Sequence, residues 1–157
     1  MANTPPFSLM LWNYPAGTPD EVKTLIGGNV NASWITNTCA IRLSRSLNYS
    51  GVPVPRHFVD MNVVSGDDHK WYAFRVREMK RWLTHKLGAP DIDATAPVDR
   101  SQFSGVRGVI GFDIHFPDAT GHLDLWDGST YIHEAVDPRD YFSIASRVVL
   151  WASPYGP

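Results

Sequence analysis

The spacing of apolar and polar residues predicts three helices in the first half of the chain. Residues 18–21 carry a capping signature, and a short helix is expected from there to Ile26, before two glycines. A second helix is expected to begin near Cys39, capped by Asn37 or Thr38, because apolar residues recur at steps of three and four until residue 47. A third helix is expected over residues 76–87, followed by Gly88.

Alternating patterns predict strands in the second half. Apolar residues alternate with polar ones or glycine over residues 110–116, and a turn is expected at 117–118. Residues 121–126 and 129–133 flank Asp127-Gly128, a typical two-residue hairpin turn, and residues 147–151 suggest a closing strand. The order of elements indicates a single α+β domain over residues 1–157, with N-terminal helices packed on a C-terminal antiparallel sheet.

Composition excludes several classes of protein. Hydrophobic residues make up 43% of the 157 residues, which is enough for a core, and the net charge of −2 comes without any basic run. We therefore expect neither a nucleic-acid partner nor membrane insertion, and no apolar stretch is long enough to span a bilayer. The N-terminus shows no cleavable secretion signal, so the protein is expected to act in the cytosol or to leave by a route that needs none.

The expected hairpin has a consequence for side-chain positions. If Asp127 and Gly128 form the whole loop, His122 lies opposite His133. One face of the hairpin would then be polar and aromatic, as in a substrate cleft, and would carry His122, Asp124, Trp126, Ser129, Tyr131 and His133. Leu123 and Leu125 would point to the core.

The single cysteine is a candidate nucleophile. A helix N-terminus and a nearby imidazolium both favour the thiolate, so Cys39 could attack an amide while His122 acts as the base. Backbone N–H groups at the start of the helix could hold the oxyanion. Spacing alone leaves alternatives open: a lone cysteine is usually a buried apolar residue, hairpin histidines are often solvated, and a His-His-Cys set could bind zinc, although no tight ligand spacing is present.

Several segments resemble one enzyme family. NTCAIRLSRSLN (residues 37–48) resembles the nucleophile helix of the fourth family of type VI secretion amidase effectors, and GHLDLWDGS (residues 121–129) resembles its histidine motif. Segments 25–30, 64–79 and 83–88 are also similar, and the likeness runs in order from about residue 25 to residue 151.

The resemblance implies a papain-like fold of the NlpC type and a cysteine peptidase mechanism without cofactor or metal. It implies an antibacterial toxin, injected by a contractile machine into the periplasm of rival bacteria. There it would hydrolyse the γ-D-glutamyl–meso-diaminopimelate bond of peptidoglycan stem peptides, and a cognate immunity protein would block it.

The resemblance also implies roles for residues. Cys39 is the implied nucleophile and His122 the implied base. The family usually places an aspartate third; the matching position here is His133, with Glu134 as second choice. Independently of the resemblance, the polar face of the expected hairpin predicts that Trp126 and Asp124 contact substrate.

Two other functions remain open on the sequence. One is a non-catalytic module that binds peptidoglycan or carbohydrate, with Trp126, Tyr131 and Trp34 stacking on sugars. The other is a cysteine acyltransferase on the same core, with an amine in place of water.

Overall fold

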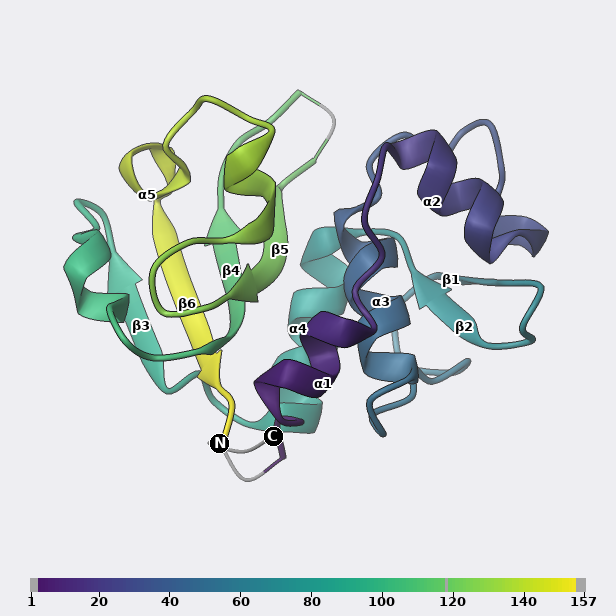
Figure 1. The fold of residues 1–157 in the computed structure, drawn as a ribbon, viewed down its shortest axis with the longest axis horizontal. Coiled ribbons are helices and arrows are strands. Elements are labelled where there is room, and N and C mark those ends of the chain that lie inside the picture. The colour runs from purple at the N-terminus through teal and green to yellow at the C-terminus, as the bar shows by residue number, and fades with distance from the viewer. Residues whose placement is uncertain (1–2, 118, 155–157) are drawn as a thin grey trace.

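The computed structural model describes residues 3–117 and 119–154, which form a helical half and a sheet half (Figure 1). The helices are α1 (Phe7–Trp12), α2 (Pro19–Ile26), α3 (Cys39–Asn48), α4 (Val76–Leu87) and α5 (Tyr141–Ile144), with short 3-10 helices η1 (Gly28–Val30), η2 (Arg100–Phe103) and η3 (Ile132–Ala135). The strands are β1 (Val63–Ser65), β2 (Trp71–Ala73), β3 (Ile92–Thr95), β4 (Gly108–Asp113), β5 (Gly121–Trp126) and β6 (Arg147–Ala152). The predicted α+β arrangement is confirmed.

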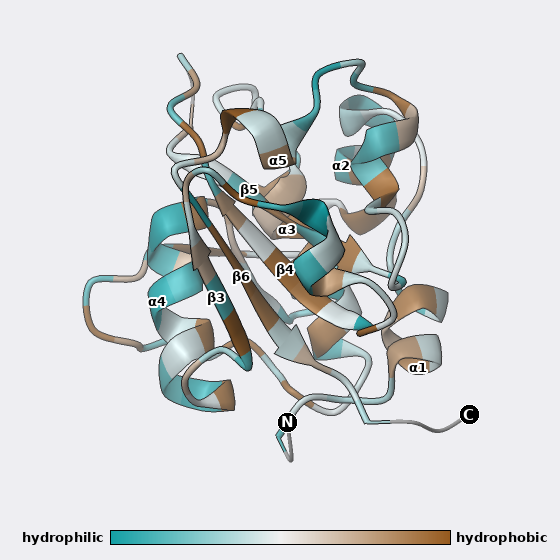
Figure 2. Ribbon diagram, turned by 90° about the vertical axis from the view of Figure 1, so that its left-hand side faces the viewer, coloured by the Kyte–Doolittle hydropathy of each residue, from teal (hydrophilic) through white to brown (hydrophobic). Residues whose placement is uncertain are grey.

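The main sheet is antiparallel and has the order β3-β6-β4-β5, while β1 and β2 form a separate hairpin. Both faces of the main sheet are covered. One core cluster packs α3 and α4 against Leu123, Leu125 and Val149, and a second cluster lies on the opposite face under η2 and α5. The apolar residues of β4 and β6 are visible between these layers in Figure 2.

The three predicted helices are present because their signals are local. The side chain of Thr18 accepts a hydrogen bond from the backbone N–H of Glu21, whose carboxylate accepts one from the N–H of Thr18, which completes the capping box of α2. The third helix has the expected bounds and ends at Gly88, which has a φ of 91°. The sequence analysis did not predict α1, β3 or the β1–β2 hairpin.

The predicted hairpin over residues 121–133 is wrong. Trp126 bridges Tyr131 instead of pairing with Ser129, and His122 pairs with Phe112 of β4. The carboxylate of Asp127 accepts hydrogen bonds from the N–H groups of Ser129 and Thr130, which makes a longer loop.

Asp124 prevents a second strand from forming. Its carboxylate accepts hydrogen bonds from the N–H groups of Ile132 and His133, which would otherwise be available to a strand ladder. The chain turns into η3 there, and β5 remains the edge strand of the sheet. The strand expected over residues 110–116 also ends early, at Asp113, and the end of its predicted turn, residue 118, lies outside the described residues.

Candidate active site

Cys39 is the first residue of α3 and lines a cleft. Its backbone N–H donates to Oδ1 of Asn37 at 3.0 Å, whereas the side chain of Thr38, at the N-cap position, makes no capping bond. Asn37 is therefore the residue that caps this end of the helix. Cys39 itself is only 6% exposed, and it lines the cleft.

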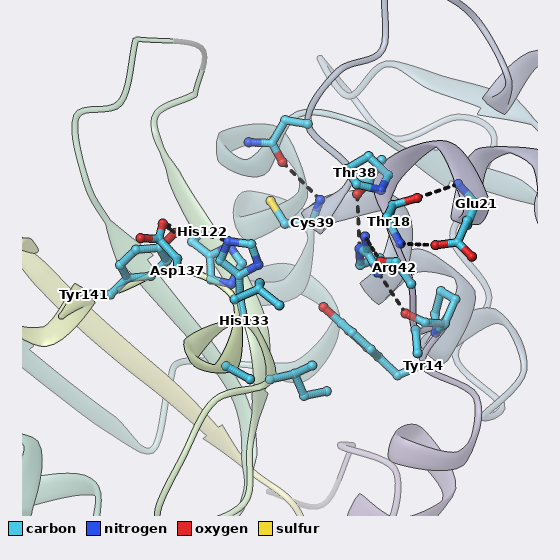
Figure 3. A pocket seen from close by; sticks show the side chains of 18 of the residues that line it. Tyr14, Thr18, Glu21, Thr38, Cys39, Arg42, His122, His133, Asp137 and Tyr141 are labelled. Carbon is cyan, nitrogen blue, oxygen red and sulfur yellow. Dashed lines mark hydrogen bonds and ion pairs between the residues drawn. The ribbon is translucent and has the colours of Figure 1, made fainter. Parts of the chain in front are cut away.

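The cleft has a volume of about 910 Å³ and lies between two walls. One wall consists of α3, the loop before it and the segment from α1 to α2. The other consists of Phe116, the start of β5 and the segment from η3 to α5 (Figure 3). Its lining includes Tyr14, Gly17, Glu21, Asn37, Cys39, Arg42, Phe116, His122, His133, Asp137, Arg139 and Tyr141. The cleft thus receives residues from segments more than eighty positions apart.

His122 reaches the cleft from β5 and is held on its other side by a carboxylate. Its Nε2 lies 2.7 Å from Oδ2 of Asp124, and the pair is buried. Burial alone would lower the pKa of His122, but hydrogen bonds to Asp124 and to the side chain of Cys39 outweigh this effect and raise the pKa to about 9. In Figure 3 the sulfur of Cys39 is turned toward this imidazole. The ring is positioned to exchange a proton with the thiol.

Asp124 is the residue whose role the sequence analysis missed. It is 0% exposed, and besides His122 it accepts hydrogen bonds from the backbone N–H groups of Leu125, Ile132 and His133. A carboxylate can only accept, so Nε2 of His122 carries the proton and Nδ1 is left for Cys39. The available signal was the spacing, since residues two apart on a strand share a face.

His133 and Glu134, the residues expected to orient His122, make other contacts. The His133 ring centroid lies 5.0 Å from that of His122, but no hydrogen bond joins the two rings. Burial, followed by the positive charge of His122, lowers the pKa of His133. The Glu134 carboxylate is paired with the guanidinium of Arg100 at 2.6 and 2.7 Å.

The structure corrects the expectation that Trp126 and Asp124 contact substrate. Trp126 is 1% exposed, and its indole N–H donates to the carbonyl oxygen of Phe103 at 2.9 Å. Trp126 belongs to the second core cluster and Asp124 is 0% exposed, so neither side chain offers a surface to a ligand.

The wall of the cleft that contains α3 is held together by hydrogen bonds from Arg42. Its guanidinium donates to the Thr38 hydroxyl and to the carbonyl oxygens of Pro15 and Gly17, so it fastens the loop before α2 to α3. That loop presents Tyr14, whose hydroxyl points into the cleft in Figure 3. Burial, followed by the nearby charges of Asp124 and Cys39, raises the Tyr14 pKa.

Two further observations concern alternatives from the sequence. Within residues 3–117 and 119–154, no three His, Cys, Asp or Glu side chains are grouped so that they could hold a metal ion. None of the described helices is long and apolar enough to cross a membrane.

Comparisons with known proteins agree on one family. A family model described as "Type VI secretion system (T6SS), amidase effector protein 4", Tae4, matches residues 35–151. The Tae4 effector of Salmonella typhimurium, solved with the immunity protein Tai4 from Enterobacter cloacae, has a TM-score of 0.85 and 33% identity over 96% of this chain and 99% of that one. The Tae4–Tai4 complex from Enterobacter cloacae gives a TM-score of 0.84 and 34% identity, again over 96% and 99% of the two chains.

The Enterobacter cloacae effector solved by itself has a TM-score of 0.80 and 32% identity, over 96% of this chain and 97% of that one. The comparison with curated proteins found no match. With the family model covering most of its length and these structures matching throughout, the chain belongs to the Tae4 family of type VI secretion amidase effectors.

Proposed function

We propose that this protein hydrolyses the γ-D-glutamyl–meso-diaminopimelate amide bond of peptidoglycan stem peptides, with Cys39, His122 and Asp124 as its catalytic machinery. The observation that carries the proposal is that Cys39 and His122 line the same cleft, while Nε2 of His122 lies 2.7 Å from the buried carboxylate of Asp124. An imidazole fixed by a buried carboxylate and placed beside a thiol is the arrangement that cysteine hydrolases use.

The reaction would proceed in two steps. The Cys39 thiolate attacks the carbonyl carbon of the γ-D-glutamyl group, and the His122 imidazolium gives its proton to the departing amine of diaminopimelate. Water then attacks the thioester and gives a proton to His122, so that the γ-carboxylic acid and the thiol are released. Asp124 keeps the ring in the tautomer that presents Nδ1 to the sulfur and stabilises its positive charge.

The oxyanion requires donors at the start of α3. The N–H of Cys39 is occupied by Oδ1 of Asn37, so a substrate carbonyl would displace this amide to reach it. The Tyr14 hydroxyl lines the same cleft and donates no hydrogen bond within the described part of the chain, which leaves it available as a second donor.

The proposed activity also predicts where the protein acts and which protein inhibits it. As a type VI effector the protein would act in the periplasm of a target bacterium, and the producing cell would need a cognate immunity protein that closes the cleft. The binding-module alternative loses two of its three aromatic platforms, because Trp126 and Tyr131 are each 1% exposed.

The test is mass spectrometry of muropeptides after digestion of purified sacculi. Wild-type protein is expected to release two fragments, cut between D-glutamate and diaminopimelate, whose summed mass exceeds that of their precursor by one water. Cys39→Ala and His122→Ala are expected to release none, while His57→Ala, which changes an exposed histidine outside the cleft, keeps full activity. Full cleavage by Cys39→Ala would contradict the proposal, and an amine adduct in place of water would assign the chain to acyl transfer.

A further inference from the structure

Few cationic groups line the cleft, and most of them already form hydrogen bonds within the protein. Arg42 and Arg139 are the lysine or arginine residues found in the lining. The Nε, Nη1 and Nη2 atoms of Arg42 all donate hydrogen bonds to oxygen atoms of the protein. His122 is committed to Cys39 and Asp124, and His133 has a lowered pKa and is therefore neutral near pH 7. Arg139 is left as the cation that can receive an anionic ligand.

Arg139 is fixed on one edge and free on the other. Its Nε and Nη2 donate to the Asp137 carboxylate, at 2.6 Å for the shortest bond, and its side chain is 55% exposed. The guanidinium lies 5.0 Å from the ring centroid of Phe116, which also lines the cleft. Among the described residues Nη1 has no acceptor, so the edge formed by Nη1 and Nη2 is open. A planar guanidinium held in this way is prepared to bind a carboxylate with two parallel hydrogen bonds.

The neighbouring Asp137 is itself held in place. Oδ2 of Asp137 also accepts a hydrogen bond of 2.7 Å from the hydroxyl of Tyr141. Hydrogen bonds from Arg139 and Tyr141 keep the pKa of Asp137 well below the usual range. Asp137 therefore remains an anion that orients Arg139 over the whole range in which the enzyme would work.

We propose that the open edge of Arg139 binds a carboxylate of the stem peptide and so selects substrates in which that carboxylate is free. This inference rests on the proposed function, since it concerns the same cleft. The peptide offers two kinds of carboxylate near the scissile bond: the α-carboxylate of D-glutamate and the carboxylates of diaminopimelate. Amidation of either removes its charge and one acceptor, which provides a direct test.

The experiment measures binding rather than turnover. Cys39→Ala protein is titrated by calorimetry with the synthetic tripeptide L-alanyl-γ-D-glutamyl-meso-diaminopimelate, with its D-isoglutamine form, and with a form amidated on diaminopimelate. We expect one amidated form to bind about tenfold more weakly than the acid, the effect of losing a charge-assisted hydrogen bond. Adding Arg139→Gln is expected to remove that preference, and Arg139→Lys to restore part of it.

The matched control is Arg147→Gln, added to the same Cys39→Ala protein. Arg147 forms a similar two-bond pair with Asp93 but lies outside the cleft lining, so the preference should persist. An equal preference for the acid with and without Arg139, or no preference in the parent protein, would overturn the inference. Because the readout is binding to a variant without the thiol, failure of this inference is separate from failure of the hydrolysis proposal.

Discussion

The two walls of the cleft are each held by one charged side chain that bonds to backbone groups, but the charges are opposite. On the wall of α3, the guanidinium of Arg42 donates to two carbonyl oxygens of the loop at residues 15–17. On the wall of β5, the carboxylate of Asp124 accepts from three backbone N–H groups at residues 125, 132 and 133.

The difference lies in burial and in what else each group touches. Asp124 is 0% exposed and is bonded to the imidazole that faces Cys39, whereas Arg42 is half-buried and bonds only to neutral oxygens. Asp124 therefore shapes its wall and also raises the pKa of His122. Arg42 only shapes its wall.

The largest effect is expected from Asp124→Ala. Removing the carboxylate leaves a buried imidazole and several backbone N–H groups without an acceptor, which should lower the free energy of unfolding by about 3–5 kcal/mol. Urea unfolding followed by circular dichroism measures this loss. Asp124→Asn is the matched variant, since it keeps the shape and one acceptor oxygen; a loss below about 1 kcal/mol for Asp124→Ala would show that the carboxylate does not hold this wall.

Arg42→Ala is expected to have a smaller effect, confined to the other wall. The loss of hydrogen bonds from a charged donor should lower the free energy of unfolding by about 1–3 kcal/mol. Hydrogen exchange of backbone amides should rise in residues 14–18 and remain unchanged in residues 131–137. Faster exchange in both segments would show that the two walls are not held independently.

His133→Ala is expected to have the smallest effect. Its ring makes no hydrogen bond to His122, so kcat for stem-peptide cleavage should fall by less than about tenfold, whereas loss of an orienting residue costs about a thousandfold or more. Asp124→Asn provides the comparison in the same assay. A larger fall in kcat for His133→Ala than for Asp124→Asn would show that His133, and not Asp124, orients the ring of His122.

The sequence predicted what depends on neighbouring residues and missed what depends on distant ones. The helices at residues 19–26, 39–48 and 76–87 follow from caps and apolar spacing, which act within a few positions. The hairpin failed because the turn signal at Asp127-Gly128 competes with a carboxylate that lies outside the turn and captures the backbone at residues 132 and 133.

The site shows the same division. The position of Cys39 at a helix start could be predicted, and so could the shared face of His122 and Asp124, two residues apart on one strand. The hydrogen bonds from Arg42 to residues 15 and 17 span at least 25 positions, so no local sequence pattern predicts them. The bond between His122 and Asp124 lies on a face of β5 that is also buried, and burial on both faces of the sheet was not evident from the alternation of β5.

The titration of His122 has a consequence for stability. Its pKa of about 9 in the folded protein lies above the value of about 6.5 for an unfolded chain. Protonation of His122 therefore stabilises the fold fully below about pH 6.5, and this contribution disappears as the pH rises through about 9.

The most direct test of the Cys39–His122–Asp124 assignment is the pKa of His122, measured by nuclear magnetic resonance of the imidazole nitrogens and assigned with His122→Gln. We predict a pKa of about 9 in the wild-type protein, a clearly lower value in Asp124→Asn, and little change in His133→Ala. An ordinary pKa near 6.5 in the wild-type protein, unaffected by Asp124→Asn, would contradict the account.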